Sequence, residues 1–159
     1  EPQAFTVSQQ LVKVPGLTGG GKMSKSAGEA DTIYLNDEPE VLRKKIMRAV
    51  SDAGPTEAGQ PKSQPVQNLF DLMQLVCNQE TISFFEIEHK EGRIRYGDLK
   101  KQLAVDMETF IAPSRDKINH QLENTSKLEE IAAYGAEKAR KSAKETMNQV
   151  REAIGFKPN

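Results

Sequence analysis

The strongest constraint on the fold is an apolar repeat of three or four residues, which begins near Asp37 and continues almost to the end of the chain. This spacing places apolar side chains on one face of an α-helix. It predicts a series of helices with apolar faces that need a common core. The helical segments are 37–50, 66–77, 81–88, 99–110 and 128–154.

Several residues give start and stop signals for these helices. Asp37 is a suitable N-cap, with Pro39 in the first turn and Glu40 in the capping-box position. Pro113 predicts a kink or a restart of a helix, and Gly155 predicts the C-terminal cap of the last one. Small residues along the last helix indicate that another helix approaches it closely.

The first 36 residues lack the helical repeat. Leu11–Val14 is a short strand candidate, 16–21 is a glycine-rich loop, and Thr32–Leu35 is a second extended stretch. The sequence therefore predicts a mainly α fold, a helical bundle preceded by a short segment of loop and strand. We expect two domains, residues 1–36 and residues 37–159.

Composition excludes several classes of protein. The net charge is −1, with 36% hydrophobic and 28% charged residues, which is not typical of a disordered acidic tail, a collagen-like chain or a histone-like protein. Residues 1–89 have a net charge of −4 and residues 90–159 one of +3. The single cysteine fits a reducing compartment. No apolar run is long enough to predict a membrane span.

The segment from Gly16 to Ser26 carries the clearest chemical signal. Gly16–Lys22 satisfies the G-x-x-x-x-G-K pattern of a P-loop, but Met23 stands where a Mg²⁺-binding hydroxyl is required. A second interpretation takes Lys22–Ser26 as the unit, because two ammonium groups with hydroxyls between them suit a triphosphate. A third is an exposed loop without a ligand. The residues alone leave these alternatives open.

Lys22–Ser26 matches the KMSKS motif of class I aminoacyl-tRNA synthetases in full, and the chain around it resembles the bacterial tryptophanyl-tRNA synthetase family. The similarity extends from about Gly16 to Gly155. The segments that carry it are Thr32–Leu35, Leu42–Asp52, Tyr96–Ala104, Ala112–Lys117 and Gly135–Arg140.

This resemblance implies a function. Lys22 and Lys25 would contact the ATP phosphates and assist catalysis, Met23 would lie near the adenine, and Ser24 and Ser26 would support the loop. The enzyme would activate tryptophan with ATP, carrying its Mg²⁺, and transfer it to tRNA(Trp). A cytoplasmic homodimer is implied for the full-length enzyme. Ala27 departs from the acidic residue that is frequent in the family after the motif.

The resemblance also divides the chain. Residues 1–36 would be a remnant of a Rossmann-like α/β catalytic domain, and residues 37–159 an anticodon-binding type of domain. The His-x-Gly-His element that class I enzymes require is absent from this sequence. We therefore expect a C-terminal fragment that by itself neither forms the adenylate nor charges tRNA. The alternatives are a tyrosyl-tRNA synthetase fragment and a stand-alone helical RNA-binding module.

Basic side chains give weaker signals, since solvated helix faces explain them equally well. The candidates for tRNA contacts are Arg43, Lys44, Arg48, Arg115, Lys138, Lys141 and Lys144. His89 and His120 are isolated from other metal ligands, so no metal site is predicted. Phe84, Phe85 and Cys77 are predicted to lie in the apolar core.

Overall fold

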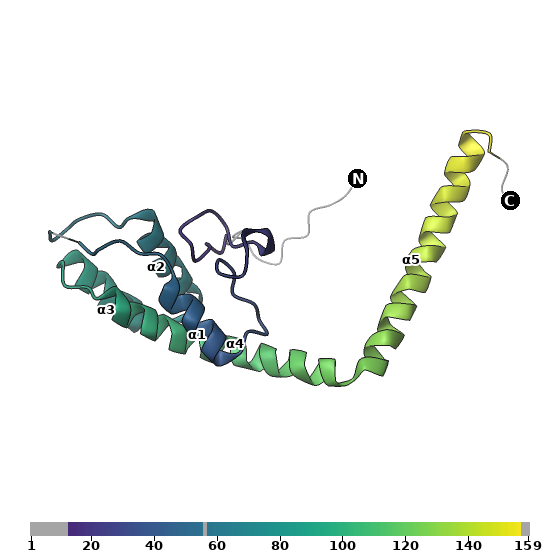
Figure 1. Ribbon diagram of the computed structural model, residues 1–159. Coiled ribbons are helices and arrows are strands. Elements are labelled where there is room, and N and C mark those ends of the chain that lie inside the picture. Colours follow the sequence, from purple (N-terminus) through teal and green to yellow (C-terminus); the bar gives the residue numbers. More distant parts are fainter. Residues whose placement is uncertain (1–12, 56, 157–159) are drawn as a thin grey trace. The chain divides into compact units, whose positions relative to one another are not determined.

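The computed structural model describes residues 13–55 and 57–156 and is mainly helical, as predicted (Figure 1). Within the described part, the chain forms no strand, and its only bridge of strand type joins Pro15 to Lys22 in antiparallel fashion. The helical elements are the short 3₁₀ turn η1 (Lys25–Ala27) and the α-helices α1 (Pro39–Arg48), α2 (Gln64–Val76), α3 (Gln79–Lys90), α4 (Tyr96–Glu123) and α5 (Thr125–Ala153).

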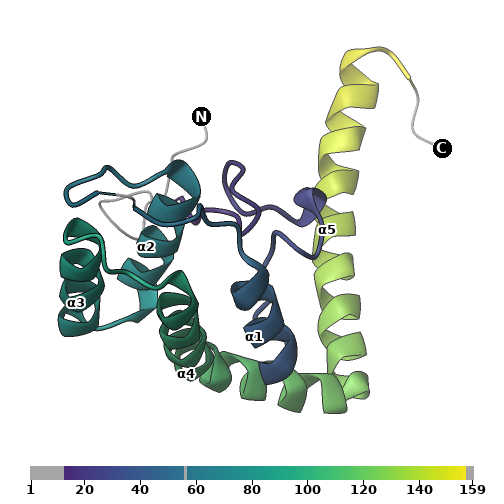
Figure 2. The same cartoon turned by 60° about the vertical axis from the view of Figure 1, so that its left-hand side comes forward.

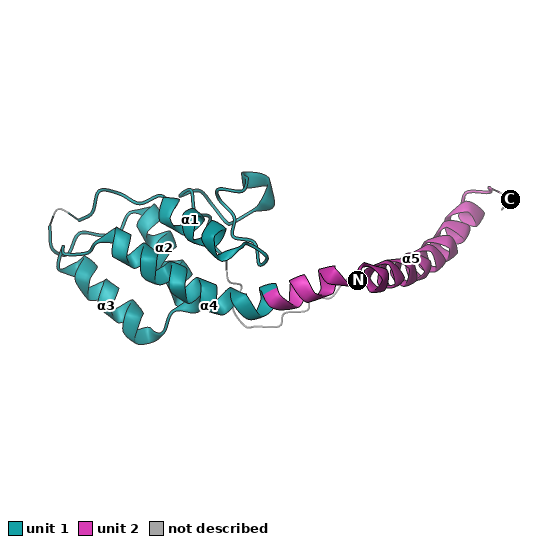
Figure 3. Cartoon of the chain, turned by 60° about the horizontal axis from the view of Figure 1, so that its bottom comes forward, with its two compact units in different colours: residues 1–115 teal, residues 116–159 magenta. Residues whose placement is uncertain are grey.

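The chain divides into two compact units, residues 1–115 and residues 116–159 (Figure 3). The first unit holds the motif loop, α1, α2, α3 and most of α4, and the second holds the end of α4 and all of α5. The glycine-rich segment and the first helices thus pack into one body. The predicted boundary between residues 36 and 37 concerns domains of a larger protein and stays a prediction.

The helices of the first unit, drawn as ribbons in Figure 2, bring the apolar faces that the helical repeat predicts into one core. Leu42 and Ile46 of α1 meet α2 and α4 residues at this core, together with Leu17 from the glycine-rich loop. Its most deeply buried large side chains are Phe70, Leu42, Ile46, Leu69, Leu72, Met73, Leu99, Leu103, Ile111 and Val66. This core positions the motif loop, because Leu17 is part of it.

Three predictions about individual apolar residues have different outcomes. Phe85 is buried, as predicted, but Phe84 is 57% exposed, so its predicted place in the core is wrong. Adjacent helix residues point in directions about 100° apart, and α3 has only one buried face. Cys77, the C-cap of α2, is only partly buried against the core. Desolvation and the neighbouring Asp106 raise the pKa of its thiol.

The beginning of α1 differs from the predicted cap. The N-cap is Glu38, without a side-chain cap, and Pro39 is the first helical residue as expected. The Asp37 carboxylate instead accepts the Tyr34 N–H at 2.9 Å and pairs with Lys45 at 2.7 Å. Asp37 therefore stabilises the turn before the helix, and its predicted capping role is wrong.

The last two helices meet at Asn124 and not at Pro113. Pro113 lies inside α4, while Asn124 N-caps α5 and accepts the Lys127 N–H at 3.2 Å. Gly155 has a φ of +78°, and the Phe156 N–H donates to Arg151 O at 2.8 Å, which confirms the predicted glycine cap. No residue of α5 is buried. The predicted close approach of another helix to its small residues stays a prediction.

None of the helices among the described residues is long and apolar enough to cross a membrane.

Candidate functional site: the KMSKS hairpin

The glycine-rich segment forms a tight hairpin that ends in the motif. The Pro15–Lys22 bridge closes it, the Gly16 N–H donates to Gly21 O at 3.1 Å, and the Met23 N–H donates to Val14 O at 2.7 Å. Residues 11 and 12 of the predicted strand lie outside the described residues. The prediction of a loop between Gly16 and Gly21 is confirmed.

Asp31 anchors the hairpin from behind. Its side chain is 3% exposed and accepts the Thr18 backbone N–H at 2.9 Å and the Thr18 hydroxyl at 2.6 Å. The Leu17 N–H donates to Asp31 O, and the Val50 N–H donates to Leu17 O at 2.8 Å. The hairpin is thus fastened both to the segment after the motif and to the end of α1.

The motif exposes both of its lysines. Lys22 and Lys25 are exposed, and Ser24 Oγ lies 2.8 Å from Ser26 Oγ across the turn. The Thr32 hydroxyl donates to Ser24 O at 2.8 Å. The two serines therefore shape the turn, and the two ammonium groups remain accessible to a polyphosphate.

The P-loop interpretation of this segment is wrong. Phosphate binding by a P-loop depends on an α-helix that begins directly after the loop, because the helix supplies aligned N–H groups and its dipole. Here Lys25–Ala27 form only a three-residue 3₁₀ turn, which ends at Gly28 with a φ of +96°.

Met23 separates the two lysines and faces the protein interior. It is partly buried against the core, and its Sδ accepts the Ile33 N–H at 3.3 Å. It also lines an apolar cleft of about 530 Å³ together with residues of α2 and α4 such as Leu72 and Ile111. This packing holds the middle of the motif while its ends stay exposed. The predicted contact of Met23 with adenine stays a prediction.

A polar hollow lies at the hairpin and α2. It has a volume of about 570 Å³ and includes the exposed Lys22 in its lining. Its other lining residues are Lys13, Pro15, Gly19, Gly20, Gly21, Gln64, Asn68 and Asp71. The hollow combines two cations and the carboxylate of Asp71 with amide groups and glycine backbone.

Three of the predicted tRNA contacts lie on α1, and the same helix carries a fourth cation, Lys45. Arg43, Lys44 and Arg48 are exposed, whereas Lys45 is half-buried between the Asp37 carboxylate and the Tyr34 ring, 4.6 Å from the ring centroid. Lys44 and Arg48 line a hollow of about 340 Å³ that also includes Glu29, Ala30, Val41 and Lys45. The structure therefore brings two of the predicted cations next to the segment that follows the motif.

The remaining predicted tRNA contacts lie in different settings. Arg115 is 8% exposed; it pairs with Glu108 and donates to Asp37 O at 3.1 Å. That hydrogen bonding lowers the pKa of the Glu108 carboxyl. Lys138, Lys141 and Lys144 are exposed on α5, in the second unit. Arg115 thus has partners inside the protein, and its predicted RNA contact stays a prediction.

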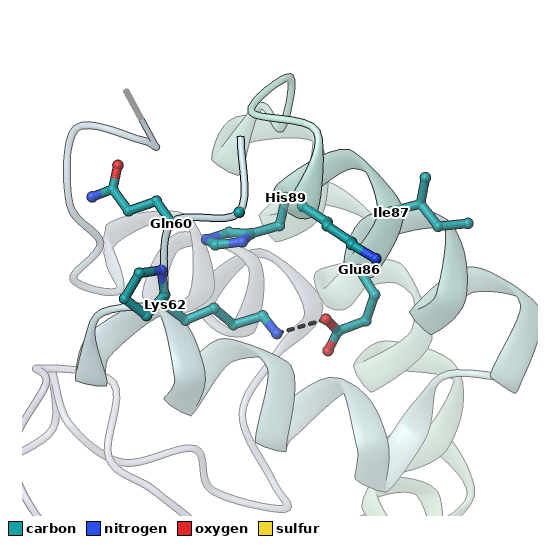
Figure 4. A pocket seen from close by; sticks show the side chains of 8 residues that line it. Gln60, Lys62, Glu86, Ile87 and His89 are labelled. Atoms are coloured by element: carbon teal, nitrogen blue, oxygen red, sulfur yellow. Dashed lines mark hydrogen bonds and ion pairs between the residues drawn. The ribbon is translucent and has the colours of Figure 1, made fainter. Parts of the chain in front are cut away.

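Sequence reasoning missed a group around α3, shown in Figure 4. His89 is 5% exposed beside Phe70, and burial followed by the charge of Lys62 lowers its pKa. Lys62 pairs with Glu86 at 2.6 Å and lies 4.3 Å from the Phe70 ring centroid. Lys62, Glu86 and His89 line a hollow of about 310 Å³. His89 differs from a surface histidine only by its burial. That burial could not be predicted, because its neighbours in the sequence are polar.

Comparison with known proteins places the hairpin in a family. The chain is 43% identical over 157 residues to the tryptophan–tRNA ligase of Porphyromonas gingivalis, covering 99% of this chain and 47% of that protein. A crystal structure of tryptophanyl-tRNA synthetase from Campylobacter jejuni, complexed with ADP and tryptophan, has a TM-score of 0.69 and 33% identity. It covers 94% of this chain and 45% of that one.

A tyrosyl-tRNA synthetase from Aeropyrum pernix shares the fold at 21% identity, with a TM-score of 0.51 over 65% of this chain and 32% of that one. This chain thus spans about half the length of the two tryptophan enzymes. The family described as tRNA synthetases class I (W and Y) matches residues 1–112. With the KMSKS hairpin in place and most of the chain matched, this protein belongs to the class I tRNA synthetases of the tryptophan and tyrosine type.

Proposed function

We propose that this chain is the C-terminal part of a tryptophan–tRNA ligase and supplies its KMSKS loop and its tRNA-binding helices. The observation that carries the proposal is the 43% identity to a tryptophan–tRNA ligase over 99% of this chain, which includes the motif. The 33% identity to the Campylobacter jejuni tryptophanyl-tRNA synthetase over 94% of this chain also favours tryptophan as the amino acid.

The chemistry assigned to the hairpin follows from its exposed lysines. The tryptophan carboxylate attacks the α-phosphorus of ATP, the bond to the β-phosphate oxygen breaks, and tryptophanyl-adenylate and pyrophosphate form. Lys22 and Lys25 stabilise the negative charge that develops on the departing pyrophosphate. A 2′- or 3′-hydroxyl of the tRNA then attacks the adenylate carbonyl, which releases AMP. ATP brings the Mg²⁺ that this reaction uses.

The partners follow from the same proposal. Arg43, Lys44 and Arg48 on α1 and Lys138, Lys141 and Lys144 on α5 are exposed cations that suit tRNA phosphates. The resemblance implies a homodimer for the full-length protein and a cytoplasmic location, where its tRNA is found.

Tryptophan-dependent ATP–pyrophosphate exchange tests the proposal in the full-length protein. Lys22→Gln and Lys25→Gln are each expected to lower kcat by about 10²-fold or more, because each removes a preorganised donor. Lys101→Gln is the control, since Lys101 is 61% exposed on α4. We expect no exchange from the present chain alone. Exchange with tyrosine in place of tryptophan would support the tyrosyl alternative, and full activity of both lysine variants would refute the assigned roles.

A further inference from the structure

Asn68 of α2 is a buried amide with one end unpaired. Its side chain is 5% exposed, and its Oδ1 accepts from Gln64 Nε2 at 2.9 Å. Its Nδ2 has no hydrogen-bond partner among the described residues and is shielded from solvent. Buried donors in native proteins almost always have an acceptor, so this orphaned group calls for a function or a second conformation.

The orphaned amide belongs to the polar hollow at the motif hairpin. Asn68 lines the hollow together with Gly19, Gly20, Gly21 and Lys22. Each of these glycines has a backbone carbonyl oxygen, which is the kind of acceptor that Asn68 Nδ2 lacks. A carbonyl oxygen can accept two hydrogen bonds. The Gly21 oxygen, which already accepts the Gly16 N–H, can therefore accept a second one.

The glycine segment has one fixed end and one end with space around it. Gly19 has a φ of +81°, and a Cβ built there would lie 3.3 Å from the Pro65 ring, so this residue rests on the start of α2. At Gly20 and Gly21 a Cβ would meet no heavy atom within 4 Å. Gly20 and Gly21 are therefore unpacked on the side where a side chain would lie, and Lys22 follows directly after them.

We propose that Asn68 is a positioning residue, whose Nδ2 donates to a backbone carbonyl of the Gly20–Gly21 segment when a nucleoside triphosphate is bound. The bond holds Lys22 where charge develops on the leaving pyrophosphate. This inference rests on the proposed function, because it concerns the same loop. It explains the orphaned donor as a group that is satisfied only in the working conformation, a pattern typical of functional sites.

The test combines stability of this chain with kinetics of the full-length protein. Asn68→Leu removes the orphaned donor and keeps similar volume, so its Tm is expected to equal or exceed that of the wild type. In ATP–pyrophosphate exchange its kcat is expected to fall at least about tenfold, with the KM for ATP changed less than about threefold. Asn68→Asp replaces the donor by an acceptor at the same shape and is expected to lose kcat as well.

Gln67→Leu is the matched control, because Gln67 is the neighbouring amide on α2 and its Nε2 is already paired with Asp71 at 2.8 Å. Its kcat is expected to remain that of the wild type. Wild-type kcat in either Asn68 variant would overturn the proposal. So would a raised KM for ATP with unchanged kcat, since the amide would then bind the nucleotide itself.

Hydrogen exchange of the Gly19–Gly21 amides in the full-length protein separates this inference from the proposed function. ATP is expected to slow this exchange in the wild type and not in Asn68→Leu, and equal exchange in both overturns the role of Asn68. A wild-type protein without tryptophan-dependent pyrophosphate exchange overturns the proposed function instead, and the hydrogen-exchange comparison still decides the role of Asn68.

Discussion

The buried carboxylate of Asp31 accepts both the backbone N–H of Thr18, at 2.9 Å, and the Thr18 hydroxyl, at 2.6 Å. A Cβ built on Gly16 would collide with that same carboxyl group. The close approach is possible because Gly16 has no side chain. Position 16 and position 31 therefore determine together how the KMSKS hairpin sits on the first unit.

Gly16→Ala is expected to lower the free energy of unfolding by about 1–3 kcal/mol, because the new methyl group displaces a carboxylate that Thr18 holds. Urea or thermal unfolding of this chain measures the effect. Gly20→Ala is the matched control, since no heavy atom lies within 4 Å of a Cβ there. We expect that variant to change stability by no more than about 0.5 kcal/mol. Equal stability of Gly16→Ala and the wild type would contradict the packing described.

Lys100→Met is expected to destabilise the first unit by about 1–3 kcal/mol. Lys100 is 9% exposed and donates to Ala49 O at 2.7 Å and to Ser51 Oγ at 3.0 Å, so it caps the end of α1 from α4. Its loss leaves the carbonyl of the buried Ala49 without this donor. Lys101→Met, on the exposed side of α4, is the control and is expected to stay within about 0.5 kcal/mol. Similar unfolding midpoints for the two variants would argue against a capping role.

Stability of this chain is expected to fall as pH drops below about 6.5, in part through His89. Burial and the charge of Lys62 lower the pKa of His89, against the opposing charges of Glu86 and Asp52. Because the pKa of His89 is lower in the folded state, the unfolded chain binds the proton more readily. The contribution of neutral His89 to the free energy of unfolding is therefore fully present above the pKa of the unfolded chain, about 6.5. This contribution is lost as the pH falls through the lowered pKa that His89 has in the folded chain.

Unfolding free energies measured between pH 5 and pH 8 check this expectation. His89→Phe retains the ring against Phe70 and removes the titration, so its stability is expected to depend less on pH than that of the wild type. His120→Gln is the control, because the His120 side chain is 81% exposed. An unchanged pH dependence in His89→Phe would show that other groups account for it.

Replacing Lys138, Lys141 and Lys144 by glutamine is expected to weaken tRNA binding by the full-length protein. Each lost phosphate contact makes the negative slope of log K against log salt shallower by about 0.7–0.9, so three contacts change it by about 2–3. Filter binding of tRNA(Trp) at several salt concentrations gives this slope. A control variant with Lys90, Arg95 and Lys101 replaced removes the same charge from exposed sites on or next to α3 and α4. Equal slopes for both variants would show that the three lysines of α5 do not contact tRNA phosphates.

Most of the helical architecture could be predicted because periodicity is a local property. Leu42 and Ile46 of α1 and Leu99 and Leu103 of α4 are buried, as their spacing predicts. The glycine cap at Gly155 was also predictable, since a left-handed residue after a helix favours glycine. The start of α1 could not be predicted in the same way. The Asp37 carboxylate does not cap the helix, because it pairs with Lys45, eight residues later in the chain.

The motif could be predicted, but its immediate surroundings could not. Lys22 and Lys25 are recognisable in the sequence and are exposed in the structure. Asp31 carries no sequence signal, because its role depends on hydrogen bonds with Thr18. Asn68 carries none either, because only the fold places it in the hollow beside the glycine hairpin. Phe84 and Phe85 show the same limit, since two adjacent phenylalanines do not reveal which of them faces the core.

The sequence by itself determined the helical repeat, the KMSKS motif and the family, because each of these depends on residue types at short spacings. Tertiary structure alone decided which polar groups are buried, and so which of them support the motif. It buried Asp31 behind the hairpin and engaged Lys45 and Arg115 in ion pairs inside the protein. It also left the Nδ2 of Asn68 without a hydrogen-bond partner among the described residues. Burial and hydrogen bonding join residues far apart in the chain, and only the folded chain brings those residues together.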